Sequence, residues 1–392
     1  MIDTYICGYD RTPIGGFKGA LSTVPATNLG ANVIKSVVEK SSIKKSFIDE
    51  VIMGNVLSAN LGQAPARQAC LGSGLANDVE CMTINKVCGS GLKSVMLADQ
   101  SIKMHNSNAV FAGGMENMSL APYYSPQSRQ GLTFGHNKLI DSIIHDGLWD
   151  PYNNFLMGNC GEVLCKENNY SRNDQDDFAI ESYRKSQDAI SKGFFKDEIS
   201  PVEVNNKKNI QLIDTDEEPL KFKKEKISTL KPAFDKEGTI TAANASSLSD
   251  GAAGVLLVSS DKINEYQLTP IAKIINHGSY AMDPIYFTKA PVFAIQKVLK
   301  SSNLNVEDID LFEINEAFSC VPMVAMDELN IPIDKINIHG GAVSLGHPIG
   351  ASGARILVTL LNALKINNLK YGIASLCIGG GEASAMLIEM ID

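Results

Sequence analysis

Short apolar runs alternate with amphipathic stretches along most of the chain. The runs at residues 2–9, 50–53 and 109–112 predict strands, and the apolar spacing over residues 28–39 and 90–104 predicts helices. Such alternation is typical of an α/β fold in which helices cover both faces of the sheet. We therefore expect an α/β protein with a largely parallel sheet.

The middle of the chain breaks this pattern. From about residue 119 to 230 the sequence is more polar and irregular, and the alternation resumes near Ile240. This stretch contains a lysine-rich run, formed by Lys221, Lys223, Lys224, Lys226 and Lys231. A run of this kind is usually a solvated face. Contact with an anionic group of a ligand is the alternative that stays open.

Three motifs of the first part of the chain return, in the same order, in the last part. The motif pairs are residues 49–55 with 308–315, 84–85 with 336–337, and 111–116 with 377–382. A repeat in conserved order predicts two similar α/β units with an insertion after the first. The predicted division is 1–118 plus 249–270 for the N-terminal unit, 119–248 for the insertion and 271–392 for the C-terminal unit.

Charge and cysteine usage narrow the range of partners and locations. Lys and Arg number 35 against 44 Asp and Glu, a net charge of −9, so the basic surface of a nucleic-acid binder is not evident. No stretch approaches the ~20 apolar residues of a membrane span. The eight cysteines are scattered without a CxxC pair, and the first residues lack the pattern of a secretory signal. We expect free thiols, a cytoplasmic location, and neither a membrane nor a nucleic acid as partner.

The first candidate for chemistry is Cys88 in the segment Asn85-Lys86-Val87-Cys88-Gly89-Ser90-Gly91. A strand signal precedes this segment and an amphipathic helix follows it. Cys88 should therefore stand at a helix N-terminus, where backbone N–H groups and the helix dipole favour thiolate over thiol. A nucleophilic cysteine needs such surroundings. An ordinary buried cysteine in a glycine-rich turn fits the segment equally well.

The second candidate is His347, within the glycine-rich segment 340–355. Small residues surround it and Pro348 follows it, so the ring has free space around it. This suits a general base better than a structural histidine. No second histidine or carboxylate stands at ligand spacing, so a metal site is not expected.

Two further segments could join them. Cys377 ends an apolar run before Gly379-Gly380-Gly381-Glu382, and Asn315 lies in Glu313-Ile314-Asn315-Glu316-Ala317-Phe318. The glycine run lacks the order of a phosphate-binding motif and is better interpreted as a strand ending in a tight turn. If the two units pack as pseudo-symmetric mates, residue 88 should approach residues 315, 347 and 377.

Taken together, these segments resemble the signatures of the thiolase family. The main ones are "NKVCGSG" around Cys88, "NEAF" at 315–318, "GGAVSLGHPIGASGAR" at 340–355 and "CIGGGE" at 377–382. Further similarity runs through residues 11–13, 113–119, 171–176, 231–234 and 241–246. The resemblance spans nearly the whole chain in order, and as a set these motifs are specific.

The resemblance implies a thiolase-like five-layered α-β-α-β-α fold made of two similar halves, with an inserted loop domain that carries much of the coenzyme A site. It also implies Claisen condensation of two acetyl-CoA to acetoacetyl-CoA and CoA, or the reverse thiolysis. Acetyl-CoA, acetoacetyl-CoA and CoA would be the partners, and the chain would form a homotetramer.

The resemblance also implies catalytic roles. Cys88 would carry the acetyl group after His347 takes its proton, and Cys377 would remove a proton from the second acetyl-CoA, in a ping-pong scheme. The enolate oxygen would meet His347 and a water held by Asn315. The oxygen on acetyl-Cys88 would meet the backbone N–H groups of Cys88 and Gly379. By the same matching, the expected substrate contacts are Met157, Phe234, Ala243, Ser246, Leu248, Ala317 and Phe318.

Some positions depart from the family pattern. Leu156-Met157-Gly158 stands where biosynthetic-type members have "HMG", so a histidine near the acyl pocket is missing. The stretch 286–291 and "TAANAS" are similar to mitochondrial-type acetoacetyl-CoA thiolases, a subgroup that can bind potassium through backbone carbonyls near Ala242, Ala243, Ala245 and Val343. Pro219 stands where that subgroup has a tyrosine. This argues against potassium activation, and no other cofactor is expected.

Three alternatives differ from this prediction. A degradative 3-ketoacyl-CoA thiolase of broader chain length would share Cys88, His347 and Cys377. A decarboxylating ketosynthase would lack a second cysteine at the Cys377 turn. A non-catalytic thiolase-like CoA or lipid binder would not need all three side chains.

Overall fold

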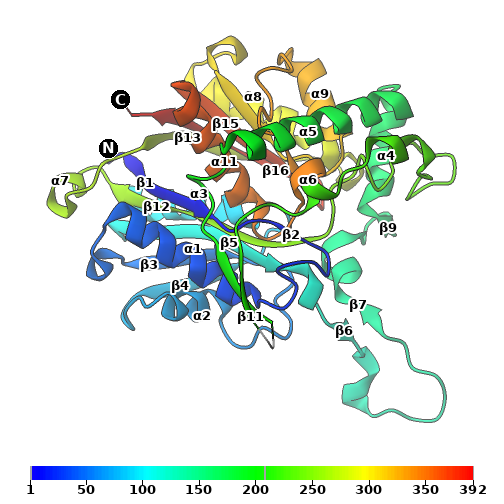
Figure 1. The fold of residues 1–392 in the computed structure, drawn as a ribbon, viewed down its shortest axis with the longest axis horizontal. Coiled ribbons are helices and arrows are strands. Elements are labelled where there is room, and N and C mark those ends of the chain that lie inside the picture. The colour runs from blue at the N-terminus through cyan, green and yellow to red at the C-terminus, as the bar shows by residue number, and fades with distance from the viewer. Residues whose placement is uncertain (1, 207–208, 392) are drawn as a thin grey trace.

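One large mixed sheet organises the protein, which we describe from a computed structural model covering residues 2–206 and 209–391 (Figure 1). Its strands follow the order β14-β15-β16-β13-β1-β12-β5-β3-β4, and β2 pairs with β12. Their bounds are β1 (Thr4–Arg11), β2 (Gly15–Gly16), β3 (Glu50–Gly54), β4 (Glu80–Ile84), β5 (Ala109–Asn117), β12 (Ser249–Ser259), β13 (Ala272–Ala281), β14 (Leu311–Ile314), β15 (Tyr371–Ile378) and β16 (Glu382–Met390).

The sheet divides naturally at the junction of β1 and β13. These strands pair only through Tyr5 with Lys273 and Ile6 with Ala272, whereas their other neighbours pair along most of their length. One half therefore contains β4, β3, β5, β12 and β1, and the other contains β13, β16, β15 and β14. The parallel pair β3–β5 of the first half corresponds to the parallel pair β14–β15 of the second. Because the two half-sheets correspond in this way, we propose that the domain boundaries predicted from the sequence apply.

The expectation of a largely parallel sheet is wrong. Only β3–β4, β3–β5 and β14–β15 are parallel, and the other pairs of the main sheet are antiparallel. Helical crossovers produce parallel strands where strands and helices alternate, as between β3 and β5. By contrast, β12 returns after the long insertion, and β16 follows β15 through a tight glycine turn. The alternation pattern alone does not reveal these two returns.

Helices complete five layers, as the resemblance implies (Figure 1). Helices α1 (Ala26–Ser41) and α2 (Pro65–Gly72) cover the outer face of the first half-sheet. Helices α3 (Ser90–Lys103) and α11 (Ser352–Asn367) lie between the half-sheets, and α8 (Ala290–Ser302) and α9 (Cys320–Leu329) cover the outer face of the second. Side chains along a strand point alternately to the two faces of the sheet, so both faces need a covering layer. In β3, Val51 and Met53 pack toward α1, whereas Ile52 packs toward α3.

Helix α11 is the most enclosed element. Every residue from Ser352 to Leu364 is buried, since the helix packs against α3 and against strands of both halves. A helix that is apolar on most of its surface belongs in the core of a large protein. The loop that precedes α11 contains His347, so this residue also lies between the two halves.

The insertion is more regular than its polar sequence indicates. It contains α4 (Met157–Glu167), the long helix α5 (Arg172–Lys192) and the short α6 (Glu218–Lys221). Ser171 and Asp174 form a capping box that starts α5. Three small hairpins accompany the helices: β6 (Tyr123–Tyr124) with β7 (Ile140–Asp141), β8 (Trp149–Asp150) with β9 (Phe155–Leu156), and β10 (Val202–Asn206) with β11 (Asn209–Ile213). The segment around β6 and β7 projects away from the body (Figure 1).

None of the described helices is long and apolar enough to cross a membrane.

Candidate active site

The segments singled out in the sequence meet between the two halves. Gly89, at the start of α3, packs so closely on the turn after Cys377 that a Cβ atom there would lie 2.3 Å from Ile378 Cδ1. A Cβ atom at Gly91 would lie 2.6 Å from the backbone nitrogen of Ala354, in the first turn of α11. The glycines of the Cys88 segment therefore allow close contact with the segments that carry Cys377 and His347.

A strained turn positions Cys88. Val87 has a φ of 46°, a left-handed conformation that is unfavourable for a β-branched residue. Local hydrogen bonds hold the turn, from Gly89 N to Lys86 O at 3.0 Å and from Ser90 N to Val87 O at 3.1 Å. Strain of this kind at a candidate nucleophile is consistent with a functional site.

The surroundings of the Cys88 thiol contradict one expectation. Burial raises the pKa of Cys88 to about 11, although the backbone N–H groups of Gly379 and of Cys88 itself oppose this shift. The helix N-terminus therefore does not make Cys88 a thiolate, because the loss of hydration outweighs the nearby N–H dipoles. The two N–H groups nevertheless lie against the sulfur, as the predicted oxyanion donors should.

The hydrogen bonds of His347 define which ring nitrogen is free. Nδ1 lies 2.6 Å from the Ser352 hydroxyl, and that hydroxyl donates to the Pro348 carbonyl at 3.0 Å. The hydroxyl proton is thus engaged, so Nδ1 is the donor and Nε2 the acceptor. Nε2 is buried and finds no partner among the described residues. Burial, aided by Arg355, lowers the pKa of His347 to about 3, so the ring is neutral near pH 7 and its Nε2 lone pair is unoccupied.

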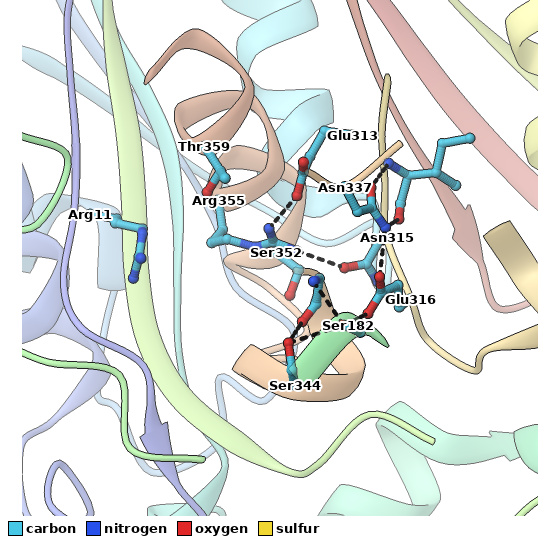
Figure 2. A network of polar contacts seen from close by, with 12 residues as sticks. Arg11, Ser182, Glu313, Asn315, Glu316, Asn337, Ser344, Ser352, Arg355 and Thr359 are labelled. Atoms are coloured by element: carbon cyan, nitrogen blue, oxygen red, sulfur yellow. Dashed lines mark hydrogen bonds and ion pairs between the residues drawn. The ribbon is translucent and has the colours of Figure 1, made fainter. Parts of the chain in front are cut away.

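A buried carboxylate from each half holds the His347 loop. On the N-terminal side of His347, Glu316 accepts a hydrogen bond from Val343 N at 3.1 Å. Glu316 also accepts from Asn337 Nδ2 at 2.8 Å and from Ser182 Oγ at 2.7 Å (Figure 2). Beyond the histidine, Glu116 accepts from Gly350 N at 2.9 Å. Glu116 also accepts from Val56 N at 3.0 Å and Leu57 N at 3.2 Å, and burial raises its pKa to about 7.

Sequence reasoning included these two glutamates in family motifs but gave them no role. The available signal was their position at the C-terminal end of a buried strand, within β5 for Glu116 and just after β14 for Glu316, since a buried carboxylate must find several donors. The hydrogen bond from His347 Nδ1 to the Ser352 hydroxyl was missed in the same way.

Asn315 and Cys377 complete the cluster. The Asn315 Oδ1 accepts a long hydrogen bond of 3.4 Å from Arg355 Nη2, and Arg355 Nη1 donates to Glu313 at 2.8 Å (Figure 2). The Asn315 Nδ2 is buried with no partner among the described residues, so it is free to hold a water or substrate oxygen. Cys377 is completely buried, and burial together with the neighbouring Cys88 raises its pKa.

Most of the expected substrate contacts line the same region. Met157 packs against the Cys377 turn, since a Cβ atom at Gly379 would lie 3.1 Å from its Sδ. Phe234 and Phe318 meet edge to face with ring centroids 5.9 Å apart. The Ser246 backbone nitrogen donates to Ala317 O at 3.0 Å, which fixes the two segments side by side. Leu248 packs against the central core that contains Cys88.

Ala243 instead lines a separate cavity of about 300 Å³ in the insertion. Three members of the lysine-rich run, Lys221, Lys223 and Lys226, also line this cavity. Tyr183 and Phe222 stack there with ring centroids 4.0 Å apart. Lys221 is engaged by Glu217 at 2.8 Å and Glu218 at 2.9 Å, whereas the other two lysines form no ion pair within the described residues.

Pro219 itself supplies no side-chain ligand for a potassium ion. Pro219 offers no side-chain oxygen, and its carbonyl already accepts a hydrogen bond of 2.8 Å from Gln187 Nε2. An alkali cation needs several oxygen ligands that are free to turn toward it.

Comparison with known proteins agrees with this arrangement. The profile of the thiolase N-terminal domain matches residues 4–261, and that of the thiolase C-terminal domain matches residues 268–390. The chain belongs to the thiolase family. An acetyl-CoA acetyltransferase of Yarrowia lipolytica is 50% identical to this thiolase over 99% of the chain and 96% of its own length. Acetyl-CoA acetyltransferase 2 of Arabidopsis thaliana is 47% identical over 99% of this chain and 97% of its own.

Solved structures place the same fold around the site. A thiolase from Ascaris suum in complex with coenzyme A superposes on this thiolase with a TM-score of 0.94 at 43% identity, covering 99% of this chain and 100% of its own. An acetyl-CoA acetyltransferase from Bacillus anthracis gives a TM-score of 0.97 at 37% identity over 100% and 99% of the two chains. The expected fold class is thus confirmed.

Proposed function

We propose that this thiolase is an acetyl-CoA C-acetyltransferase that condenses two acetyl-CoA to acetoacetyl-CoA and CoA, and catalyses the reverse thiolysis. The observation that carries the proposal is the close packing of two segments, one with the buried thiol Cys88 and one with a buried neutral imidazole whose Nε2 has no partner among the described residues. The names of the similar proteins support the acetyl substrate. A non-catalytic binder would have no need of this pairing.

The first half-reaction transfers an acetyl group to Cys88. The sulfur attacks the thioester carbonyl of acetyl-CoA while His347 Nε2 takes the thiol proton, because the thiol with its raised pKa does not ionise unaided. Collapse of the tetrahedral intermediate breaks the bond to the CoA sulfur. The leaving CoA thiolate recovers the proton from His347, and acetyl-Cys88 remains.

The second half-reaction uses Cys377. Once Cys88 is acetylated, the buried Cys377 thiol yields its proton to His347, because burial has raised its pKa and it does not ionise unaided. The thiolate then removes a methyl proton from the second acetyl-CoA, and the resulting carbanion attacks the acetyl carbonyl. Cys88 leaves as a thiolate and regains the proton from His347, which closes the cycle.

Two groups of donors serve the two oxyanions. The N–H groups of Cys88 and Gly379 lie against the Cys88 sulfur and suit the tetrahedral oxygen. Protonated His347 and the free Asn315 Nδ2, the latter acting through a water, suit the enolate oxygen. Each such donor lowers an acyl-transfer barrier by about 3–4 kcal/mol.

The acyl pocket supports a short substrate. Met157 packs against the Cys377 turn, and the bulky Phe234–Phe318 pair belongs to the same apolar cluster as Cys377, which supports a short acyl chain. The test is CoA-dependent cleavage of acetoacetyl-CoA beside a series of longer 3-ketoacyl-CoAs. We expect fast cleavage of acetoacetyl-CoA and loss of activity with length. Equal or faster cleavage of long chains would assign the protein to the degradative class.

We further propose that Lys223 and Lys226 attract the phosphates of the nucleotide end of CoA. Both line the cavity that also contains Ala243, and neither is engaged by a carboxylate within the described chain. Substituting both by Met should raise the KM for acetyl-CoA with little change in kcat. The control is Lys300→Met, since Lys300 is exposed at the end of α8.

Potassium is not part of the proposed mechanism, because Pro219 has no side-chain oxygen and its carbonyl is engaged by Gln187 Nε2. Exchange of potassium for sodium at constant ionic strength should therefore leave kcat/KM unchanged.

The proposed assembly is a homotetramer. The projecting segment around β6 and β7 exposes Tyr123, Leu132, Phe134 and Leu139. Apolar side chains gathered on a projecting segment are typical of a protein–protein contact, and a second copy is the expected partner. Phe134→Ser should reduce the mass measured by light scattering if this segment holds the tetramer together.

The proposed location is the cytoplasm. All eight cysteines are free thiols, as expected in a reducing compartment.

A further inference from the structure

Two thiols outside the active site lie in the same packed cluster, one on α2 and one on the adjacent strand β4. Cys70 lies in α2 and is completely buried, whereas Cys81 lies in the edge strand β4 and is partly exposed. Both side chains belong to this one cluster, and Ala66 N at the start of α2 donates to Thr83 Oγ1 of β4 at 2.9 Å, which holds the two elements together. The proposed catalytic cycle uses neither residue.

A fixed positive charge stands beside this pair. Arg67 lies one turn before Cys70 in α2, and its Nη1 donates a hydrogen bond of 3.8 Å to the Cys81 sulfur. The same guanidinium is anchored by the Asn77 carbonyl, which accepts from Nη2 at 2.7 Å, and by the Val79 carbonyl. The cation is therefore held in place rather than free to turn into solvent.

These contacts shift the pKa values of the two thiols in opposite directions. Hydrogen bonds from Cys70 and Arg67 lower the pKa of Cys81 to about 7, against the opposing effect of burial. The neighbouring Cys81 and burial both raise the pKa of Cys70. By comparison, burial alone raises the pKa of Cys7, in the same core cluster, to about 12. A partly exposed thiolate beside a second thiol is the arrangement of an oxidisable pair.

We propose that Cys70 and Cys81 form a peroxide-sensitive dithiol, activated by Arg67, which closes into a reversible disulfide. The Cys81 thiolate attacks one oxygen of a hydroperoxide and becomes a sulfenic acid, and the peroxide O–O bond breaks to release water or an alcohol. The Cys70 sulfur then displaces hydroxide from the Cys81 sulfur and loses its proton, which gives the disulfide and one water. Two electrons pass from the two thiols to the peroxide, and an external thiol restores the pair.

The test is a hydrogen peroxide titration of the full-length protein at neutral pH. Aliquots are quenched with N-ethylmaleimide, digested and analysed by mass spectrometry for a Cys70–Cys81 cross-linked peptide. We expect this peptide at lower peroxide than any oxidised form of Cys7 or Cys320, and we expect dithiothreitol to remove it. The Cys88→Ala protein should give the same result, which makes the test independent of the proposed function.

Two variants test the assignment of roles. Arg67→Gln should slow formation of the cross-link by about tenfold, because the thiolate fraction near neutral pH falls as the pKa rises; the control Arg129→Gln should not. Cys70→Ser should leave Cys81 as a sulfenic acid that dimedone labels. The proposal is overturned if no Cys70–Cys81 peptide forms while Cys81 stays open to alkylation, or if Arg67→Gln closes at the wild-type rate.

Discussion

The equivalent strands β5 and β15, one in each half of the molecule, end in similar glycine-rich motifs at residues 111–116 and 377–382. The two motifs have different roles. In the first half, Gly113 and Gly114 lie inside β5, where a Cβ atom at Gly114 would lie 2.1 Å from the Gly350 carbonyl. The following Glu116 is fully buried and binds the His347 loop. In the first half, the motif therefore supports a loop that belongs to the other half.

In the second half the strand stops and the motif becomes a turn. Gly380 and Gly381 both have a φ of 93°, which lets β15 end after Cys377 and β16 begin at Glu382. Glu382 is partly exposed and forms an ion pair with Lys86, beside the Cys88 turn. The same repeated framework therefore has two roles: the motif in β5 supports the His347 loop, and the motif after Cys377 forms part of the reacting site.

The largest effects should come from the two cysteines, one from each half. Cys88→Ala should abolish condensation and thiolysis, a loss of about four orders of magnitude or more, since no other nucleophile can hold the acetyl group. Cys377→Ala should abolish condensation but retain exchange of labelled CoA with acetyl-CoA, which needs only the first half-reaction. If both variants lost exchange equally, the division of roles between the halves would be wrong.

The two supporting carboxylates should give the next largest effects. Glu116→Gln and Glu316→Gln each place an amide NH₂ among backbone N–H donors, which should displace the His347 loop. We expect kcat to fall by about 10- to 100-fold with little change in KM, because a displacement of about 1 Å is enough to spoil alignment.

Glu307→Gln, at an exposed carboxylate, is the control for both supporting residues. The melting temperature of each variant should be measured together with its kcat and KM. A loss of kcat that merely followed the fraction of unfolded protein would argue for a structural role alone.

The pH dependence of alkylation sharpens the comparison between the thiols. Because the pKa of Cys88 is raised to about 11, the thiol is neutral below that pH, and its alkylation by iodoacetamide should rise about tenfold per pH unit up to pH 10. Cys81, with its pKa lowered to about 7, should instead approach a plateau above pH 8. A plateau for Cys88 near neutral pH would mean that the helix N-terminus does stabilise its thiolate.

The smallest effect concerns the ion pair between the halves. Lys86 and Glu382 are both partly exposed, so their pairing should contribute only about 0.2–1 kcal/mol. Lys86→Glu and Glu382→Lys should each lower kcat a few-fold by loosening the Gly379 turn, and the double exchange should recover part of the loss. Additive losses in the double variant would show that the pair does not position the turn.

Much of the fold followed from the sequence. The five-layered thiolase fold is confirmed, and the motif repeat located the equivalent strands β3 and β14 correctly. The antiparallel returns were missed, because β12 enters the sheet after the insertion and the residues that place it beside β1 and β5 are distant in sequence. The regularity of α5 was also missed, since a long polar helix buries too few residues to give a strong apolar pattern.

The candidate site was predictable in its members but not in its electrostatics. The structure brings the segments of Cys88, His347 and Cys377 together as expected. The sequence could not reveal that burial would outweigh the helix N-terminus at Cys88, since that balance depends on the packing of both halves around the sulfur. Nor could it reveal that Ser352 assigns the proton of His347 to Nδ1, which depends on where the Ser352 hydroxyl donates.

The proposal that Cys88 carries the acetyl group can be tested by trapping this intermediate. Cys377→Ala protein is mixed with acetyl-CoA, quenched in acid, digested and examined by mass spectrometry. We expect one acetyl group per chain on the peptide that contains Cys88, with an equivalent release of CoA and no acetoacetyl-CoA. An unmodified Cys88 peptide in folded protein, or acetoacetyl-CoA formed at the wild-type rate, would contradict it.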